Sequence, residues 1–335
     1  MGYEWIGIAV LWLFLYGYVI VASIDFGAGF YSFYSLLTRE KHAIHPIIER
    51  YLSPVWEVTN VFLIFLLVGI VGFFPDTAYY FGTALLVPGS IAVILLAIRG
   101  SFYAFHSANS HPVYPFLYGL TGLLIPASLS VVLTISEGGF IRLTADGRVE
   151  LLYEELFWSP FSWSVVVLAI VSVLFISAAF LTYYASRAGD ERALKVLRRY
   201  ALGWSGPTLL SSLFIFSTLR QHNPDHFHRM LEYGWMFGLS FLCFLLAVVL
   251  IWRKRAFGWA FSLVMAQFFF AFFGYGVSHL PYLLYPYLTV QDSVNNPTMT
   301  MALTIAFQAG LLLLVPSLVL LLRLFLFDAK YVRGQ

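Results

Sequence analysis

Long apolar segments run through almost the whole chain and constrain its fold more than any other feature. A helix needs about 20 predominantly apolar residues to cross the hydrocarbon core of a bilayer. Segments of this kind occupy residues 5–36, 53–74, 79–104, 113–135, 161–186, 200–219, 231–252, 257–284 and 300–327. Backbone polar groups in lipid must be satisfied within their own segment, so these segments should be helical. The sequence therefore predicts an all-α polytopic membrane protein with nine transmembrane helices.

The composition supports a membrane protein rather than a soluble one. The chain is 60% hydrophobic and only 11% charged, whereas ordinary soluble domains carry about 25% charged residues. A soluble protein of 335 residues could not cover its apolar surface with so few charges. The net charge is +2 and the basic residues form no groove-like cluster. We therefore expect no nucleic-acid partner.

The distribution of basic residues predicts how the chain crosses the membrane. With nine spans, the loops fall into two sets. Of the 19 lysines and arginines, one set holds only Arg142, Arg148, Arg220 and Arg229. Basic residues accumulate in cytoplasmic loops, so that set faces outward. We expect the N-terminus outside, the C-terminus in the cytoplasm, and an outer loop at 136–160 that forms a short hairpin or a helical turn.

Three ionisable residues within the predicted spans are the first candidates for a functional site, because a charge inside a bilayer is costly unless it is solvated or paired. Asp25 lies about 20 residues into the first span, or about 30 Å at 1.5 Å per residue, which puts it in the cytoplasmic half. Glu57 lies near the cytoplasmic start of the second span, and Arg99 lies near the cytoplasmic end of the third. All three should lie at a similar depth.

Two roles are open for these residues. In the functional interpretation, Asp25 and Glu57 pass protons inward from the cytoplasm, because a desolvated carboxyl group can exchange protons near neutral pH. In the structural interpretation, Arg99 pairs with one of the two acids and ties three helices together. Gly27 and Gly29 favour the proton role for Asp25, since they permit close helix approach or a water-filled gap beside it.

The histidines give weaker signals. His222 and His226 are four residues apart in a predicted outer loop, but Pro224 lies between them. We expect a solvated polar loop there rather than a metal site. His279 is well embedded in a predicted span, and a hydrogen-bonded core histidine is the expectation. Because the spans show no evident pair of histidines, the sequence predicts neither haem nor metal on this chain.

Three short motifs contain or flank the charged residues. They are "DFGAG" at 25–29, "PVWEVTNVFL" at 54–63, and a third set made of Phe74, Pro75, Tyr79, Arg99, Gly100 and Phe105. They resemble motifs of subunit II of the cytochrome bd-type quinol oxidases: D-G-F-D-[LM]-G-V-G, P-x-W-D-G-N-x-x-W-L, and F-P-x-x-Y followed by F-R-G or F-R-P and by F-E-F-R. Tyr79 comes one residue later than the tyrosine of F-P-x-x-Y. The C-terminal region has a similar layout to the family, and the middle of the chain matches it in hydropathy and span order.

The chain also departs from the family pattern. Ala22 and Ser23 replace a leading Asp-Gly, and Glu57 stands where the family usually has Asp. Ala104 and His106 replace the acid and the base of F-E-F-R. The sequence therefore resembles a divergent branch of the family.

The resemblance implies a specific role. It implies two four-helix bundles, here 1–135 and 161–284, and a peripheral helix at 300–327. It implies a prokaryotic cell membrane, a partner subunit I that carries haems b and d and reduces oxygen, and a haem-free role for this chain. A small single-helix accessory subunit and a lipid or quinone are further implied partners. Asp25 and Glu57 would deliver cytoplasmic protons, with Arg99 as their charge partner.

Two rival functions are compatible with the same residues. A proton-coupled secondary transporter could use nine spans and buried acids. Such carriers often show inverted repeats with broken helices in both halves, and Pro88, Pro126 and Pro207 do not form a clear pair of that kind. The other rival is a purely structural membrane subunit, in which the acids serve only in ion pairs.

Overall fold

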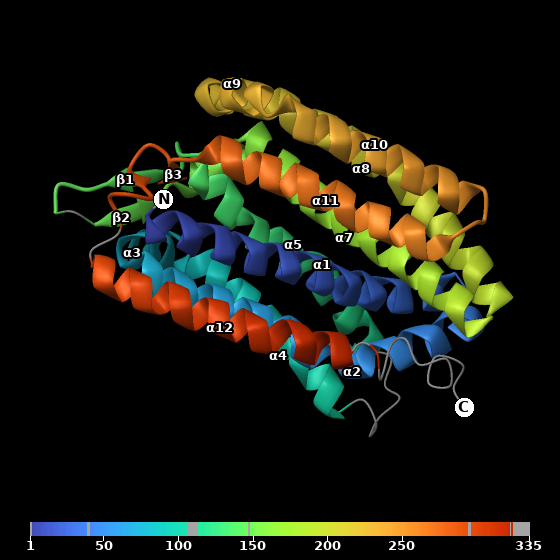
Figure 1. The fold of residues 1–335 in the computed structure, drawn as a ribbon. Coiled ribbons are helices and arrows are strands. Elements are labelled where there is room, and N and C mark those ends of the chain that lie inside the picture. The colour runs from blue at the N-terminus through green and yellow to red at the C-terminus, as the bar shows by residue number, and fades with distance from the viewer. Residues whose placement is uncertain are drawn as a thin grey trace.

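Long helices lie side by side and form most of the molecule (Figure 1). The computed structural model describes residues 2–38, 41–105, 113–146, 148–293 and 296–321, together with Arg323. The helices are α1 (Tyr3–Leu37), α2 (Lys41–Phe73), α3 (Pro75–Ala84), α4 (Leu86–Phe105), α5 (Val113–Ser136), α6 (Tyr153–Trp158), α7 (Pro160–Ala188), α8 (Glu191–His222), α9 (Pro224–Glu232), α10 (Gly234–Trp252), α11 (Phe257–His279) and α12 (Pro297–Leu321).

The described residues contain six helices that are long and apolar enough to cross a membrane, namely α1, α5, α7, α10, α11 and most of α12. The bent pair of α2 and α3 makes a seventh if it counts as one span. The polytopic all-α prediction is confirmed. The count of nine spans stays a prediction, as does the division into bundles at 1–135 and 161–284 with a peripheral helix at 300–327.

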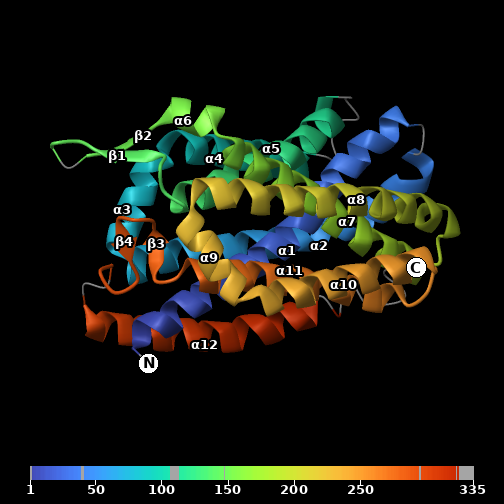
Figure 2. The same ribbon diagram turned by 90° about the horizontal axis from the view of Figure 1, so that it is seen from above.

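The predicted span 79–104 is wrong as one continuous helix, because α3 ends at Ala84 and Leu85 (φ −90°, ψ 9°) separates it from α4. A sharper break precedes it, between the predicted spans 53–74 and 79–104. The chain leaves α2 at Phe74, whose backbone lies outside the helical region (φ −133°, ψ 67°). A residue before proline disfavours helical geometry, and Pro75 is well suited to the first turn of a new helix. α3 is bent by 120° from the end of α2 and lies across one end of the bundle (Figure 2). α4 then begins at Leu86.

Two small hairpins lie at the end of the bundle that carries the N-terminus (Figures 1 and 2). In the first, β1 (Ile141–Leu143) pairs antiparallel with β2 (Val149–Leu151), and α6 follows. The predicted hairpin or helical turn within 136–160 is therefore confirmed, and the loop contains both. In the second, β3 (Tyr282–Leu284) pairs antiparallel with β4 (Leu288–Thr289).

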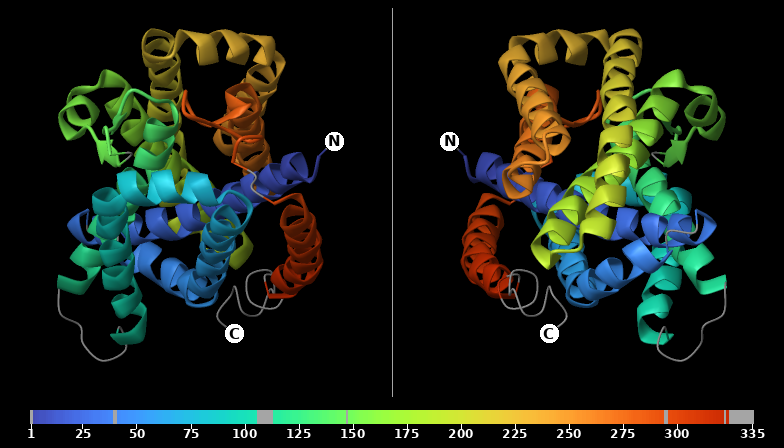
Figure 3. Two further views of the ribbon diagram at one scale, coloured as in Figure 1. Left: turned by 90° about the vertical axis from the view of Figure 1, so that its left-hand side faces the viewer. Right: turned by 90° about the vertical axis from the view of Figure 1, so that its right-hand side faces the viewer.

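α1 is the central helix and packs against α2, α5 and α7. α12 lies at the edge, next to α1 and α2 (Figure 3). Aromatic side chains fill this contact: the Phe14 ring stacks on Phe65 at 5.1 Å and meets Phe307 edge-on at 6.1 Å between centroids. α1 begins at the end with the hairpins, and α12 runs from that end to the opposite one (Figure 1).

Candidate functional site

A buried ion pair joins α1 to α4. The Nε of Arg99 donates to Oδ2 of Asp25 over 2.9 Å, and its Nη2 donates to the Asp25 carbonyl oxygen over 2.6 Å. Each residue is only 1% exposed. The guanidinium therefore contacts both the side chain and the backbone of one residue, which fixes α4 against α1. The sequence placed these residues at the same depth, and the structure brings them into contact.

α5 completes the surroundings of this pair. The Tyr118 hydroxyl donates to Oδ1 of Asp25 over 3.1 Å, and the Tyr118 carbonyl accepts from Nη1 of Arg99 over 2.9 Å. The guanidinium also lies over the Tyr118 ring, 3.9 Å from its centroid. A cation held over an aromatic face is stabilised by the ring quadrupole. Both carboxylate oxygens of Asp25 thus accept hydrogen bonds from neighbouring helices.

Glycines allow the three helices to approach closely around the pair. A side chain at Gly29 would lie 2.9 Å from Nη1 of Arg99 and from the Tyr118 carbonyl oxygen. A side chain at Gly122 on α5 would collide with the Phe26 carbonyl oxygen of α1. The sequence left open whether the glycines beside Asp25 permit close approach or a water-filled gap. At Gly29 the described residues fill the space.

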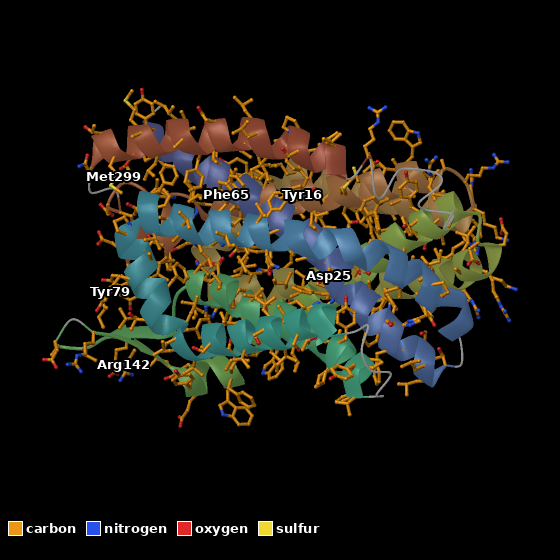
Figure 4. The ribbon with its side chains drawn as sticks, turned by 90° about the horizontal axis from the view of Figure 1, so that it is seen from below. Tyr16, Asp25, Phe65, Tyr79, Arg142 and Met299 are labelled. Atoms are coloured by element: carbon orange, nitrogen blue, oxygen red, sulfur yellow. The ribbon has the colours of Figure 1, made fainter. Side chains whose placement is uncertain are left out.

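The pair lies inside the helix bundle rather than at its surface. Figure 4 places Asp25 among packed helices, in the half away from the end marked by Arg142 and Met299. A buried charge needs a partner, and removing one member of a buried pair is strongly destabilising. Glu57 lies on α2, but its side chain lies outside the described residues. The structure therefore gives geometry for two of the three predicted residues, Asp25 and Arg99.

A second buried polar cluster lies at the opposite end of the bundle, around Glu137. Its carboxylate accepts from the Tyr275 hydroxyl over 2.5 Å and from Nδ2 of Asn223 over 3.0 Å. Nδ1 of His226 lies 2.8 and 2.9 Å from the two carboxylate oxygens. The other ring nitrogen, Nε2, lies 2.9 Å from Oγ of Ser278. These residues come from the end of α5, from the start of α9 and from the last turns of α11.

His226 is not in a solvated polar loop, so that expectation was wrong. Asn223 caps α9 by accepting from the His226 backbone N–H over 3.1 Å, and the His226 ring is fully buried. The His222 side chain lies outside the Glu137 cluster. Its Nε2 lies 3.0 Å from the Gly138 carbonyl oxygen, and its ring stacks between Phe140 and Phe161. The two histidines therefore do not share a site.

His279 is buried, but it differs from the expected hydrogen-bonded core histidine. It is 7% exposed, and among the described residues neither ring nitrogen has a hydrogen-bond partner. Its Nδ1 lies 3.4 Å from Oε1 of Glu137. The residues of this cluster are far apart in the sequence, which is why motif spacing missed them. Glu137 and His226 shared the predicted outer side, but His279 was placed inside a span, so position gave only part of the signal.

Burial and hydrogen bonding set the charges in the cluster. Burial raises the pKa of Glu137, but its contacts with His226 and His279 outweigh burial and hold the pKa well below its usual range. Removal from water lowers the pKa of the His226 imidazole, although the adjacent Glu137 carboxylate opposes that shift.

Comparisons with known proteins agree with this architecture. The chain matches the family described as cytochrome bd terminal oxidase subunit II over residues 3–325. It is 34% identical over 340 residues to a Bacillus subtilis (strain 168) protein provisionally named a cytochrome bd menaquinol oxidase subunit II, covering 98% of this chain and 97% of that protein.

A solved structure is similar along the whole chain. A chain in the bd oxidase structure from Geobacillus thermodenitrificans is 63% identical and superposes with a TM-score of 0.85. The match covers 98% of this chain and 100% of that one. The sequence resemblance is thereby confirmed, and with it membership of a quinol oxidase complex. The chain belongs to the cytochrome bd terminal oxidase subunit II family.

Proposed function

We propose that this chain is the haem-free subunit II of a quinol:oxygen oxidoreductase, which supports a haem-bearing subunit I and contributes a proton route from the cytoplasm. Subunit I would carry haems b and d and reduce oxygen to water. That reaction consumes protons as well as electrons. Protons taken from the cytoplasmic side make the reaction electrogenic. Buried acids in the cytoplasmic half of the membrane could carry those protons inward.

The buried Asp25 on α1 carries this proposal. Its carboxylate lies 2.9 Å from Nε of Arg99 and accepts from Tyr118, with all three side chains almost completely buried. An ionisable residue at membrane depth is a functional candidate because burial is costly. In this proposal Asp25 and Glu57 deliver protons toward the partner subunit, and Arg99 holds Asp25 in place.

The same ion pair supports a second candidate, a purely structural subunit. Arg99 bridges α1, α4 and α5 through Asp25 and the Tyr118 carbonyl, so the acids could serve helix packing alone. The two candidates differ in one measurable property. A structural acid can be replaced by its amide without loss of turnover once the complex is assembled, whereas a proton-delivering acid cannot.

The expected partners include a quinol and lipid. The Bacillus subtilis relative is named for menaquinol, and menaquinol is the species we propose for this complex. An apolar groove between α1 and α12, lined by Leu13, Gln308, Leu311, Leu312, Val315 and Pro316, fits the tail of a lipid or quinone. A small accessory subunit and an outward N-terminus complete the proposal.

Affinity purification through a tag on this chain tests the haem-free role. We expect a haem-bearing partner to co-purify, with an absorption spectrum of haems b and d and quinol-dependent oxygen consumption. The chain expressed without its partner should show no haem absorption. Haem bound to the isolated chain, or active transport by this chain alone, would contradict the proposal.

A further inference from the structure

The Glu137 cluster has a use that the oxidase role does not explain. One ligand atom each from Glu137, His226 and His279 can be chosen so that all lie within 4.8 Å of one another, and all three residues are buried. The carboxylate lies at the end of α5, and the two imidazoles lie on α9 and at the end of α11. Two imidazoles and one carboxylate form a ligand set typical of zinc.

The hydrogen bonds around His226 suit metal binding. The Ser278 hydroxyl lies 2.8 Å from the Tyr275 carbonyl oxygen, to which it donates. It can then accept from Nε2–H of His226 over 2.9 Å. Without a cation, Nδ1–H donates to the Glu137 carboxylate. A bound cation would displace that proton and leave the Nδ1 lone pair facing the ion. Metal-binding histidines usually donate their other ring N–H to a neighbour of this kind.

His279 supplies an independent observation. Its ring is more than nine-tenths buried, and neither nitrogen has a hydrogen-bond partner among the described residues. A buried polar group without a partner costs free energy. Nδ1 points to the cluster, 3.4 Å from Oε1 of Glu137 and with the ring centroid 5.0 Å from that of His226. A cation between these groups would satisfy Nδ1.

The distances fit a tetrahedral ion after a small adjustment. Bonds of 2.0–2.1 Å in a tetrahedron separate ligand atoms by about 3.3 Å. The distance from His279 Nδ1 to Glu137 Oε1 is already 3.4 Å. The distance of 2.8 Å between His226 Nδ1 and the same oxygen must widen by about half an ångström. Glu137 is joined to its backbone by rotatable bonds that permit such a change.

We propose that Glu137, His226 and His279 bind one zinc-like divalent cation, which joins the ends of α5 and α11 to α9. Water or the Tyr275 hydroxyl, which already contacts Glu137, would take the fourth position. The site lies at the end of the bundle that carries the N-terminus, on the predicted outer face. It is separate from the Asp25–Arg99 pair and needs no oxidase turnover to be detected.

Zinc content of the purified oxidase complex tests the site. The complex is washed with a chelator, reloaded with zinc chloride, desalted and analysed by elemental mass spectrometry against its haem iron. The variant is His279→Gln. The His279 ring makes no hydrogen bond to the described residues, so its replacement breaks none of them. The matched control is His228→Gln, an exposed histidine on the same helix as His226.

We expect wild type and His228→Gln to retain one zinc ion per chain at this site, and His279→Gln to lose it. Loss of the ligand should weaken zinc binding by about 10- to 100-fold or more. Zinc-edge absorption fine structure of the wild type should show two imidazole nitrogens, a readout that needs no variant. Equal zinc in wild type and His279→Gln, equal loss in His228→Gln, or a zinc shell without imidazoles would each overturn the proposal.

Discussion

The guanidinium of Arg99 contacts Asp25 twice, through Oδ2 at 2.9 Å and through the backbone carbonyl at 2.6 Å. One residue of α4 therefore recognises both the side chain and the backbone of one residue of α1. Such a contact fixes the rotation and the height of one helix against the other. It also means that the role of Asp25 in proton transfer can be judged only in variants that keep this packing.

Replacement of Arg99 by methionine should destabilise the complex by about 3–5 kcal/mol, because it leaves the Asp25 carboxylate buried without the guanidinium. The thermal unfolding midpoint of the purified complex, measured in one detergent, checks this. Arg142→Gln is the control, since Arg142 is exposed on β1 and should change stability by less than about 0.5 kcal/mol. An unchanged midpoint in the Arg99 variant would mean that the pair contributes little.

Replacement of Tyr118 by phenylalanine removes the hydroxyl that donates to Asp25 and keeps the ring next to the guanidinium. A hydrogen bond to a charged group contributes about 1.5–3 kcal/mol. Tyr31→Phe is the matched control, because that buried hydroxyl donates to the neutral Leu174 carbonyl, a bond that contributes about 0.5–1.5 kcal/mol. Tyr118→Phe should therefore lose more thermal stability than Tyr31→Phe. A larger loss in Tyr31→Phe would contradict a charged Asp25 carboxylate as the acceptor of the Tyr118 hydroxyl.

Replacement of Gly122 by alanine should push α5 away from α1, since the new Cβ would collide with the Phe26 carbonyl oxygen. Overpacking of this kind costs about 1–3 kcal/mol. Gly203→Ala on α8 is the control: no atom beyond its chain neighbours and its own helix backbone lies within 4 Å of the point that its new Cβ would occupy, and alanine is favoured in helices by up to about 1 kcal/mol. The two variants should shift the unfolding midpoint in opposite directions, and a stabilised Gly122→Ala would contradict the close packing.

The sequence predicted that Arg99 lies at the depth of Asp25 and Glu57 and could pair with either, because a bilayer limits where charges can go. Each charge has a depth set by its distance from the end of an apolar segment, and α1 and α4 both pack against α5. Depth alone could not identify Tyr118, because a tyrosine in an apolar helix has many permitted environments. The tyrosine became part of the site only when the packing of α5 was known.

Two features lay beyond the sequence for different physical reasons. The predicted spans 53–74 and 79–104 already separate at the 120° bend between α2 and α3. Hydropathy continued through the second break, at Leu85 between α3 and α4, although Pro88 in the first turn of α4 marked where a new helix begins. The Glu137 cluster joins residues 89 positions apart along the chain, and such contacts follow from the packing of helix ends. A hydropathy profile treats these ends as loops and therefore predicts solvated side chains there.

The most direct test of the proton route uses the assembled oxidase in liposomes. Oxygen consumption and membrane potential are measured for wild type, Asp25→Asn and Glu57→Gln, with Asp146→Asn as an exposed control and the haem spectrum as the check on assembly. Asparagine keeps an acceptor oxygen but removes the counter-charge of Arg99, so we expect less assembled complex for Asp25→Asn. Per assembled complex, counted from the haem spectrum, we predict turnover and potential lowered by about tenfold or more in the two variants of the buried acids. Full turnover and full potential in Asp25→Asn and Glu57→Gln would contradict the account and leave the acids a purely structural role.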